Sequence, residues 1–451
     1  MRRRFYGIVT CLPLILVVAL ALRVGFARQQ ERQIPRYLVG LVPFLQETGN
    51  IAYSIALGHG FGSPYWQETG PTAWLTPVYP YIVAAAYRIF GIHTPHALFA
   101  IVLLNILFSV VTCIPIFYAG KRLGGLAIAS GAAWLWAVFP NAIIIPFEWV
   151  WDTSLSALLM ATILWATLRV AENGTRAASR NLNQIDAEEV HITKDPGCRA
   201  WIWYGLLWGL TLMTAPSLGA MLPFLIGWII LQGTRRGLSD ATHKRRLLSG
   251  TALAVGIALL CCVPWTIRNY RAFHRFIPLR SNLPFELWLG NNHNFDPQSQ
   301  IVPPADPERS EIRNYIQMGE IVFMQNKWHE AVKFMGTHPR LEVILFARRF
   351  VATWTGMEKP VQGFMDTDSL LTRSVLMSNT LIAVAALCGI VLLFLRRSPF
   401  AFLLAAFPIV FPILYYVTHA SLRYRHPIDP ILTLLTAVMI AGLSNPSAFR
   451  S

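Results

Sequence analysis

Two kinds of ionisable side chain recur in the polar segments between the long apolar stretches of this sequence. Carboxylates stand at Glu47, Glu148 and Asp152, and arginines gather further along. These arginines are Arg268, Arg271, Arg280, Arg423 and Arg425. A carboxylate can take a proton from an attacking hydroxyl, and arginines can neutralise a departing phosphate. The pattern suits transfer of a group from a phosphate to a hydroxyl, where a well-placed base contributes on the order of 10²–10⁴ in rate.

Each of these residues also has a structural interpretation. Arginines populate the headgroup regions of membranes, so the basic residues can be interfacial anchors. Glu47 can be an acid at a helix N-terminus, where the helix dipole favours negative charge. Asp152 can be the N-cap of a helix that starts near Thr153. For single residues both interpretations stay open, while for the arginines as a cluster we favour phosphate binding.

Metal and nucleotide sites have no signature here. The histidines in the polar segments lack close metal-ligand spacing, and the six cysteines suggest no framework of ligands or disulfides. The glycine-rich stretch 58–62 is not a nucleotide loop, because no strand precedes it. The sequence predicts no metal and no other cofactor, and leaves use of a divalent ion open.

Composition places the chain in a membrane. Of its 451 residues 54% are hydrophobic and 14% charged, which does not fit a soluble protein. The net charge of +15 is spread in short Lys and Arg runs between apolar stretches, a pattern that sets membrane orientation, so no nucleic acid partner is expected. We predict an all-α polytopic membrane protein with about ten transmembrane helices. The predicted spans are 5–26, 96–118, 124–143, 152–170, 200–215, 218–233, 247–266, 374–395, 398–417 and 427–444.

The positions of the basic runs predict the topology. If the short apolar stretch 77–91 does not cross, one side of the membrane carries most of the basic runs, as the positive-inside rule requires. These runs are Arg2 to Arg4, Lys121 and Arg122, the loops 171–199 and 235–246, Arg396 and Arg397, and Arg450. We therefore predict that 77–91 is a re-entrant or interfacial helix on the outer side. Both termini are then cytoplasmic, residues 1–26 form an uncleaved first span, and the active site is periplasmic in a multi-pass protein of the cell inner membrane.

Three regions follow from this topology. Residues 1–266 form an N-terminal transmembrane module, whose first outer loop, 27–95, carries the catalytic acid. Residues 267–373 form a small helical outer-face domain, and 374–451 contain the last membrane helices. The charged residues Arg23 and Asp429 lie at the ends of predicted spans, so no span has a charge near its centre. This argues against a proton-coupled transporter.

Several motifs, in this order, resemble the C-type (GT-C) glycosyltransferase superfamily. The acid Glu47 precedes an Ile-Ala helix that ends in a glycine-rich turn, and the Pro-rich stretch 70–80 leads into a short outer helix. A basic turn follows at 119–124, and a second outer acid stands at Asp152. The stretches 264–270, 285–292 and 423–427 complete the set. The chain looks most like the branch with protein O-mannosyltransferases and the aminoarabinose transferases that modify lipid A.

This resemblance implies transfer of a sugar from a polyprenyl-phosphate donor with inversion at the anomeric carbon. Glu47 would be the base, although many relatives carry an Asp-Glu pair where this chain has Glu47-Thr48. Asp152 would position the acceptor or assist the base, with Glu148 as a substitute. The five arginines would bind the donor phosphate, and the candidate substrate contacts are His59, Tyr79, Trp151 and Asn291.

The remaining partners are broad classes. The acceptor can be a lipid, a glycan or a protein, and membrane lipids surround the spans. Two alternatives stay open: a ligase of the same fold that transfers a lipid-linked glycan, and a lipid or glycan flippase, which is not an enzyme. The uncharged spans count against the flippase.

Overall fold

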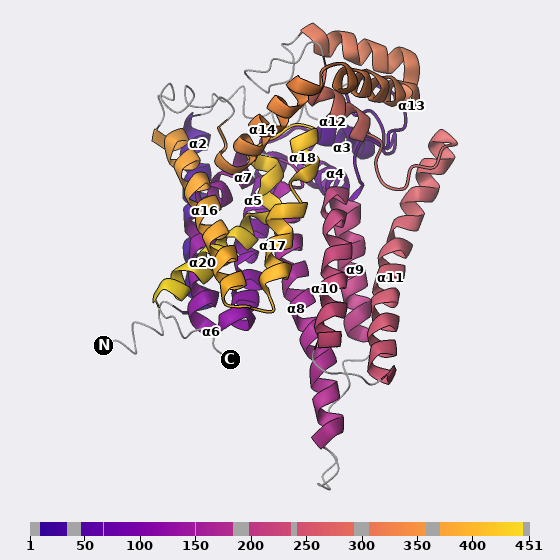
Figure 1. Ribbon diagram of the computed structural model, residues 1–451. Coiled ribbons are helices and arrows are strands. Elements are labelled where there is room, and N and C mark those ends of the chain that lie inside the picture. Colours follow the sequence, from indigo (N-terminus) through magenta and orange to yellow (C-terminus); the bar gives the residue numbers. More distant parts are fainter. Residues whose placement is uncertain are drawn as a thin grey trace.

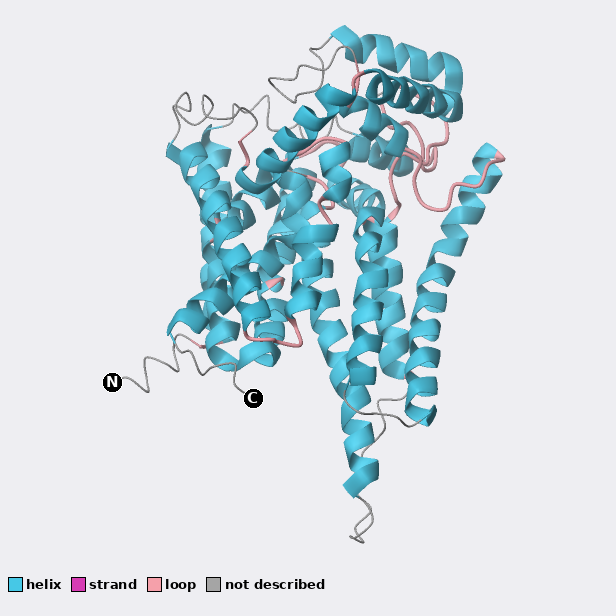
Figure 2. Ribbon diagram, viewed as in Figure 1, coloured by secondary structure: helices cyan, strands magenta, loops and turns pink. Residues whose placement is uncertain are grey.

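The computed structural model describes residues 10–33, 47–65, 67–148, 150–183, 198–235, 241–292, 306–357 and 370–444. Within them every regular element is a helix, apart from an isolated β-bridge between Gly62 and Pro71 (Figure 2). Long helices form a bundle, and a smaller group of helices lies across one end of it (Figure 1). The predicted all-α polytopic fold is confirmed.

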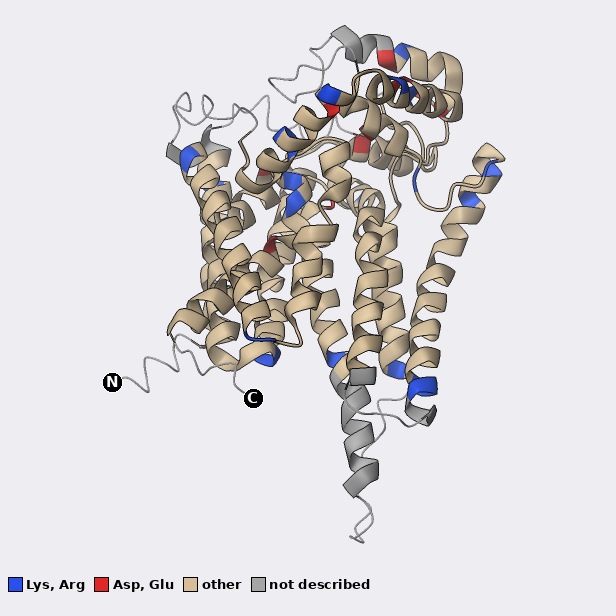
Figure 3. Ribbon diagram, in the orientation of Figure 1, with Lys and Arg blue, Asp and Glu red and all other residues tan. Residues whose placement is uncertain are grey.

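Seven helices among the described residues are long and apolar enough to cross a membrane. They are Leu12–Gln30, Pro95–Val138, Thr153–Ala171, Pro216–Gly233, Lys244–Phe273, Thr372–Leu395 and Leu422–Ser444. Lys and Arg residues gather toward the two ends of the bundle, whereas the stretch between is mostly uncharged (Figure 3). This distribution fits a hydrocarbon layer around the middle of the helices.

The stretch Pro95–Val138 is a hairpin of two passes. Helix α5 (Pro95–Val111) continues into α6 (Cys113–Val138), which reverses direction at Gly124 and Gly125. Gly125 has φ +82°, a conformation that L side chains rarely adopt. The two arms pack closely: Trp136 Nε1 donates to the carbonyl of Ser109 across them at 2.7 Å. The basic turn predicted at 119–124 lies at this reversal.

Two shorter elements complete the bundle. Helix α9 (Arg199–Thr214) packs along α11 (Ala241–Phe273), and α17 (Ala401–Val410) continues into α18 (Ile413–Val417). With the hairpin counted as two passes, the seven stretches give eight passes among the described residues, and the predicted spans 200–215 and 398–417 correspond to the shorter helices α9 and α17 with α18. The other long helices are α2 (Leu12–Gln33), α8 (Thr153–Asn183), η2 with α10 (Pro216–Met221, Leu222–Arg235), α16 (Leu370–Leu395) and α20 (Asp429–Ser444).

Arg23 departs from its predicted place. It lies near the middle of α2 instead of at the end of a span, because the helix runs from Leu12 to Gln33 and so extends beyond the predicted 26. Its side chain is fully buried. The guanidinium donates to Ser109 Oγ at 2.9 Å and to the carbonyls of Ala19, Ala137 and Trp136. This set of acceptors offsets the cost of burying the charge.

The stretch predicted as an interfacial helix is α4 (Val78–Phe90), whose 13 residues are too few to cross a membrane. It packs against α3 (Glu47–Leu57), the helix that begins with the predicted base. Helices α12 (Leu283–Gly290), α13 (Asp306–Thr337) and α14 (Pro339–Thr355) form what we call the cap, which lies across the end of the bundle (Figure 1). The predicted domain boundary at 266 falls inside α11, which continues to Phe273 after its apolar pattern stops.

Candidate active site

A cavity opens at the end of the bundle where the cap lies. Its wall comes from helix termini and connecting segments that are far apart in the sequence. These segments lie within 47–48, 74–80, 151–156, 214–218, 280–286 and 414–427. Three carboxylates, Glu47, Asp152 and Glu286, and two guanidinium groups, Arg280 and Arg423, line this cavity. The structure thus brings together two of the three predicted acids and two of the five predicted phosphate ligands.

Glu47 enters the cavity from the first turn of α3. The helix is fixed by its buried face, including Ile51 and Ile55, and by polar bonds to the loop that follows it. Asn50 Nδ2 donates to the carbonyl of Pro64 at 3.0 Å, and Ser54 Oγ donates to the carbonyl of Gly60 at 3.0 Å. At this position the dipole of α3 favours the ionised carboxylate.

Asp152 combines both roles considered from the sequence. It immediately precedes α8, and its carbonyl accepts a hydrogen bond from the backbone N–H of Ser156 at 2.7 Å, as the first residue of a helix requires. Its carboxyl group also lines the cavity, near Arg280 and Arg423. Burial raises the pKa of Asp152, and the two arginines oppose this effect.

Arg423 is held against aromatic rings. Its guanidinium carbon lies 3.4 Å from the ring centroid of Trp151 and 4.5 Å from that of Tyr424. Its Nη2 donates to the hydroxyl of Tyr424 at 2.5 Å. Tyr424 in turn stacks on Tyr415, with ring centroids 4.9 Å apart. Cation–π contacts of this kind orient the planar guanidinium. Trp151, predicted to contact substrate, therefore lies beside a predicted phosphate ligand.

The segment between α11 and α12 supplies a second basic side chain with its own polar surroundings. Arg280 Nη2 lies 3.9 Å from Glu286 Oε1, which also accepts a hydrogen bond from Asn282 Nδ2 at 2.7 Å. His419 Nε2 lies 3.6 Å from Glu286 Oε2 and 2.8 Å from the hydroxyl of Tyr424. Burial lowers the pKa of His419, which favours the neutral ring near pH 7.

Four residues of this cavity were not predicted as site residues: Glu286, Asn282, His419 and Tyr424. Glu286 stands in the stretch 285–292 that carries part of the family resemblance, so a signal was present. The same is true of Tyr424, which stands in the stretch 423–427. Asn282 and His419 lie near predicted arginines in the chain, but no spacing marks them. Tyr79, a predicted substrate contact, does line the cavity, and its hydroxyl donates to Asn105 Oδ1 at 2.9 Å.

Glu148 lies apart from the other two acids. It lines a neighbouring hollow together with Asn141, Thr372 and Ser421, and Arg423 contributes to the walls of both. The reason is local: Glu148 is the last residue of α7 (Pro140–Glu148), whereas Asp152 immediately precedes α8.

Two arginines predicted to bind phosphate lie near the C-terminal end of α11. Arg268 donates to the carbonyls of Thr72, at 2.6 Å, and Phe61, and its guanidinium lies 5.0 Å from the ring centroid of Trp265. It therefore ties the segment between α3 and α4 to α11. Arg271 is exposed. Neither lines the cavity.

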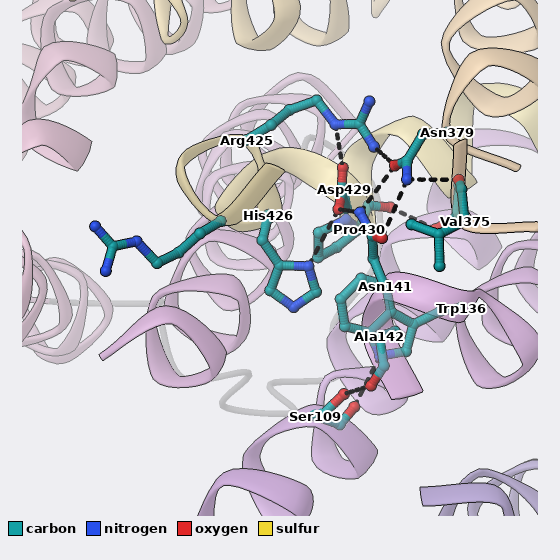
Figure 4. A network of polar contacts seen from close by, with 12 residues as sticks. Ser109, Trp136, Asn141, Ala142, Val375, Asn379, Arg425, His426, Asp429 and Pro430 are labelled. Atoms are coloured by element: carbon teal, nitrogen blue, oxygen red, sulfur yellow. Dashed lines mark hydrogen bonds and ion pairs between the residues drawn. The ribbon is translucent and has the colours of Figure 1, made fainter. Parts of the chain in front are cut away.

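Arg425 is buried inside the bundle, two residues after Arg423. Its Nε forms an ion pair with Asp429 Oδ1 at 2.8 Å, and its Nη1 donates to the carbonyl of Trp354 at 2.9 Å. His426 Nδ1 lies 3.1 Å from Asp429 Oδ2. Figure 4 shows Arg425 and His426 turned toward Asp429, with Asn141 and Asn379 beside it. This network anchors the short helix α19 (Leu422–Arg425), which carries Arg423.

The two remaining predicted substrate contacts are also elsewhere. His59 is exposed and pairs with the exposed Glu68, with Nδ1 and Oε1 3.4 Å apart. Asn291 is buried, donates to the carbonyls of Leu287 and Val417, and accepts from Arg349 Nη2 at 2.9 Å. It thus helps to attach the cap to the bundle. Across the described ranges, no group of three His, Cys, Asp or Glu residues is placed to hold a metal ion.

Neither a protein-family model nor a curated protein matches the chain. Solved structures do. The Archaeoglobus fulgidus oligosaccharyltransferase in complex with Zn and sulfate matches with a TM-score of 0.54 and 13% identity, over 97% of this chain and 50% of that one. The archaeal enzyme AglB in complex with an inhibitory peptide and a dolichol-phosphate matches with a TM-score of 0.52 and 12% identity, over 100% and 51%.

The form tethered to an acceptor peptide with the NVT sequon has a TM-score of 0.51 and 13% identity, over 99% and 52%. At such low identity the likeness concerns the fold, and this chain spans about half the length of those proteins. The chain therefore has the fold of the matched part of these oligosaccharyltransferases.

Proposed function

We propose that this protein is a membrane glycosyltransferase that transfers a sugar from a polyprenyl-phosphate donor to a hydroxyl acceptor, with inversion. The observation that carries this proposal is the cavity itself. It combines the carboxylates of Glu47 and Asp152 with the guanidinium groups of Arg280 and Arg423 at one end of a bundle that can span a membrane. These are the groups that such a transfer needs at its two reacting ends.

The reaction proceeds by a single displacement. The acceptor oxygen attacks the anomeric carbon while a carboxylate takes its proton, and the bond to the phosphate oxygen breaks with its electron pair on the phosphate. Arg280 and Arg423 stabilise the charge on this leaving group. Asp152 lies near both arginines and thus on the leaving-group side. In-line attack requires the base on the opposite side, so Glu47 is the base and Asp152 orients the arginines.

A lipid-linked donor fits the position of the cavity. A polyprenyl phosphate keeps its headgroup at the membrane surface and its tail in the hydrocarbon, which matches a cavity at the end of a membrane bundle. The AglB structure contains a dolichol-phosphate, and another structure of the same fold contains sulfate. Both support a phosphate-lipid donor. The basic runs of the sequence favour a periplasmic cavity in a bacterial inner membrane, with both termini cytoplasmic.

The two candidate enzymes differ in the group that they transfer and in the acceptor that receives it. The sequence motifs favour the protein O-mannosyltransferase and aminoarabinose transferase branch, which uses a single sugar on a monophosphate. The matches to oligosaccharyltransferases favour a ligase that transfers a glycan to a larger acceptor. We prefer the single-sugar transferase on the order of the motifs, and the ligase is the second candidate.

The test is transfer of radiolabelled sugar by the purified protein in lipid nanodiscs. The donor panel contains polyprenyl-monophosphate sugars and lipid-linked oligosaccharides, each with lipid, glycan and peptide acceptors. Glu47→Gln should reduce kcat by about 10²–10⁴-fold while donor binding persists. The matched control is Glu68→Gln, an exposed acid of the same outer loop, which should keep wild-type activity.

Other outcomes change the assignment. Full activity in Glu47→Gln, with loss in Asp152→Asn, would make Asp152 the base. Transfer only from the oligosaccharide donors would favour the ligase. No transfer from any donor, with lipid scrambling in liposomes, would favour the flippase. The anomeric configuration of the product, read by NMR, tests inversion independently.

A further inference from the structure

A carboxylate of the cap accepts hydrogen bonds from several segments around the cavity mouth. Glu320 of α13 is only 5% exposed. Its Oε1 accepts from the backbone N–H of Ala73 at 2.8 Å and from Ser281 Oγ at 2.6 Å. Its Oε2 accepts from Thr72 Oγ1 at 2.5 Å and from the hydroxyl of Tyr315 at 2.8 Å.

Two of these segments continue directly into the wall of the cavity. Thr72 and Ala73 precede Trp74, which lines it, and Ser281 stands between the cavity residues Arg280 and Asn282. The backbone N–H of Ser281 also donates to the carbonyl of Ala73 at 2.8 Å. Glu320 is therefore an acceptor that the first outer loop and the segment carrying Arg280 share.

The local structure directs Glu320 to this junction. The preceding residue, Gly319, has φ +74° and ψ 162°, so α13 is kinked there. The rings of Trp74, Tyr315 and Phe323 pack together beside it, with centroids 5.4 to 5.8 Å apart. This apolar cluster excludes water from the carboxylate, which strengthens hydrogen bonds to it.

We propose that Glu320 is a positioning residue that joins the first outer loop to the Arg280 segment and thereby places Arg280 for the donor phosphate. The catalytic effect of Glu320 rests on the proposed function, whereas the junction between the two segments does not depend on that function. Glu320 contacts neither the reacting groups nor the cavity, so it acts through Ser281 and Arg280.

Two substitutions of Glu320 distinguish the role of its shape from the role of its hydrogen-bond acceptors. In Glu320→Gln the remaining oxygen can accept from Ala73 N–H and Ser281, while the amide nitrogen faces the hydroxyls of Thr72 and Tyr315, which can rotate to accept. In Glu320→Ala all four donors lose their acceptor. Positioning therefore predicts a graded series in which Gln retains most of the function and Ala loses it. The matched control is Glu330→Ala on the same helix, where the side chain is half exposed.

The first measurement is hydrogen–deuterium exchange in nanodiscs, which needs no substrate. Glu320→Ala should speed amide exchange in peptides covering 72–76 and 280–286 by roughly tenfold or more, because both segments lose charge-assisted hydrogen bonds. Exchange in α20 should not change, and Glu330→Ala should match the wild type throughout. Unchanged exchange at both segments in Glu320→Ala would overturn the junction.

The second measurement is kinetic. Glu320→Ala should lower kcat/KM by roughly 10²-fold, since small displacements at a reacting centre have effects of that size. The change should appear mainly as a higher donor KM, and Glu320→Gln should restore most of it. Faster exchange with unchanged KM and kcat would reduce Glu320 to a structural role and overturn the positioning. A wild type that transfers no sugar would refute the proposed function, and exchange would still decide the junction.

Discussion

Arg423 provides the sharpest test of the proposed donor phosphate site. The substitution Arg423→Lys keeps the positive charge but removes the planar fork and its contact with Trp151, now 3.4 Å from guanidinium carbon to ring centroid. A hydrogen bond to a charged group contributes about 1.5–3 kcal/mol. Since each 1.4 kcal/mol is about a factor of ten, kcat/KM should fall roughly 10- to 140-fold.

The assay is steady-state transfer with the donor varied at saturating acceptor. Most of the loss should appear in the donor KM, with the acceptor KM unchanged. Arg271→Lys is the matched control, because Arg271 is an exposed arginine that does not line the cavity. Equal effects of the two substitutions, or none from Arg423→Lys, would refute the assignment of Arg423 to the donor phosphate.

Three further predictions concern pH and stability. Because burial raises the pKa of Asp152, its contribution to the acidic limb of kcat/KM should lie above the ordinary value of 3.8, with activity falling as Asp152 becomes protonated on lowering the pH; Asp152→Asn should remove this contribution and leave only the one due to Glu47, the proposed base. Asp429→Asn leaves Arg425 as an unpaired buried charge and should destabilise the fold by about 3–5 kcal/mol, seen as a lower Tm; an unchanged Tm would contradict the network. Gly125→Ala, at φ +82°, should cost about 1–2 kcal/mol. Gly227→Ala in α10, where nothing lies near an added Cβ, should stabilise instead by up to about 1 kcal/mol, and equal shifts would contradict this.

The membrane fold was predictable because lipid leaves few choices. Every backbone group must be paired within the hydrocarbon, so apolar stretches of sufficient length become helices. The positions of basic residues then predicted two spans, joined at the turn near Gly124 and Gly125, instead of a single long span. Helix ends were less predictable: α2 and α11 both continue beyond their apolar stretches, since polar and charged residues are compatible with a helix that projects from a membrane.

The site was predictable where chemistry and local structure coincide. Glu47 and Asp152 both stand where a helix begins, and acids there have a recognisable sequence signature. Arg280 and Arg423 were found as members of a basic cluster. The junction at Glu320 was not predicted, because its partners Thr72 and Ser281 are 248 and 39 residues away and no periodicity connects them.

The arginines fall into two groups that their spacing in the sequence does not distinguish: those that hold segments of the fold together and those that face the cavity. Arg23, Arg268 and Arg425 all donate to backbone carbonyls, and these bonds tie one segment of the chain to another. A guanidinium engaged in this way has its donors directed into the protein, so a ligand would have to replace bonds that hold the fold together. Arg280 and Arg423 instead meet carboxylate, hydroxyl and aromatic partners on a cavity wall. Such contacts orient the group without enclosing it. The distinction follows from three-dimensional placement: Arg423 and Arg425 are two residues apart, yet one faces the cavity and the other the core, because α19 turns its successive side chains in different directions.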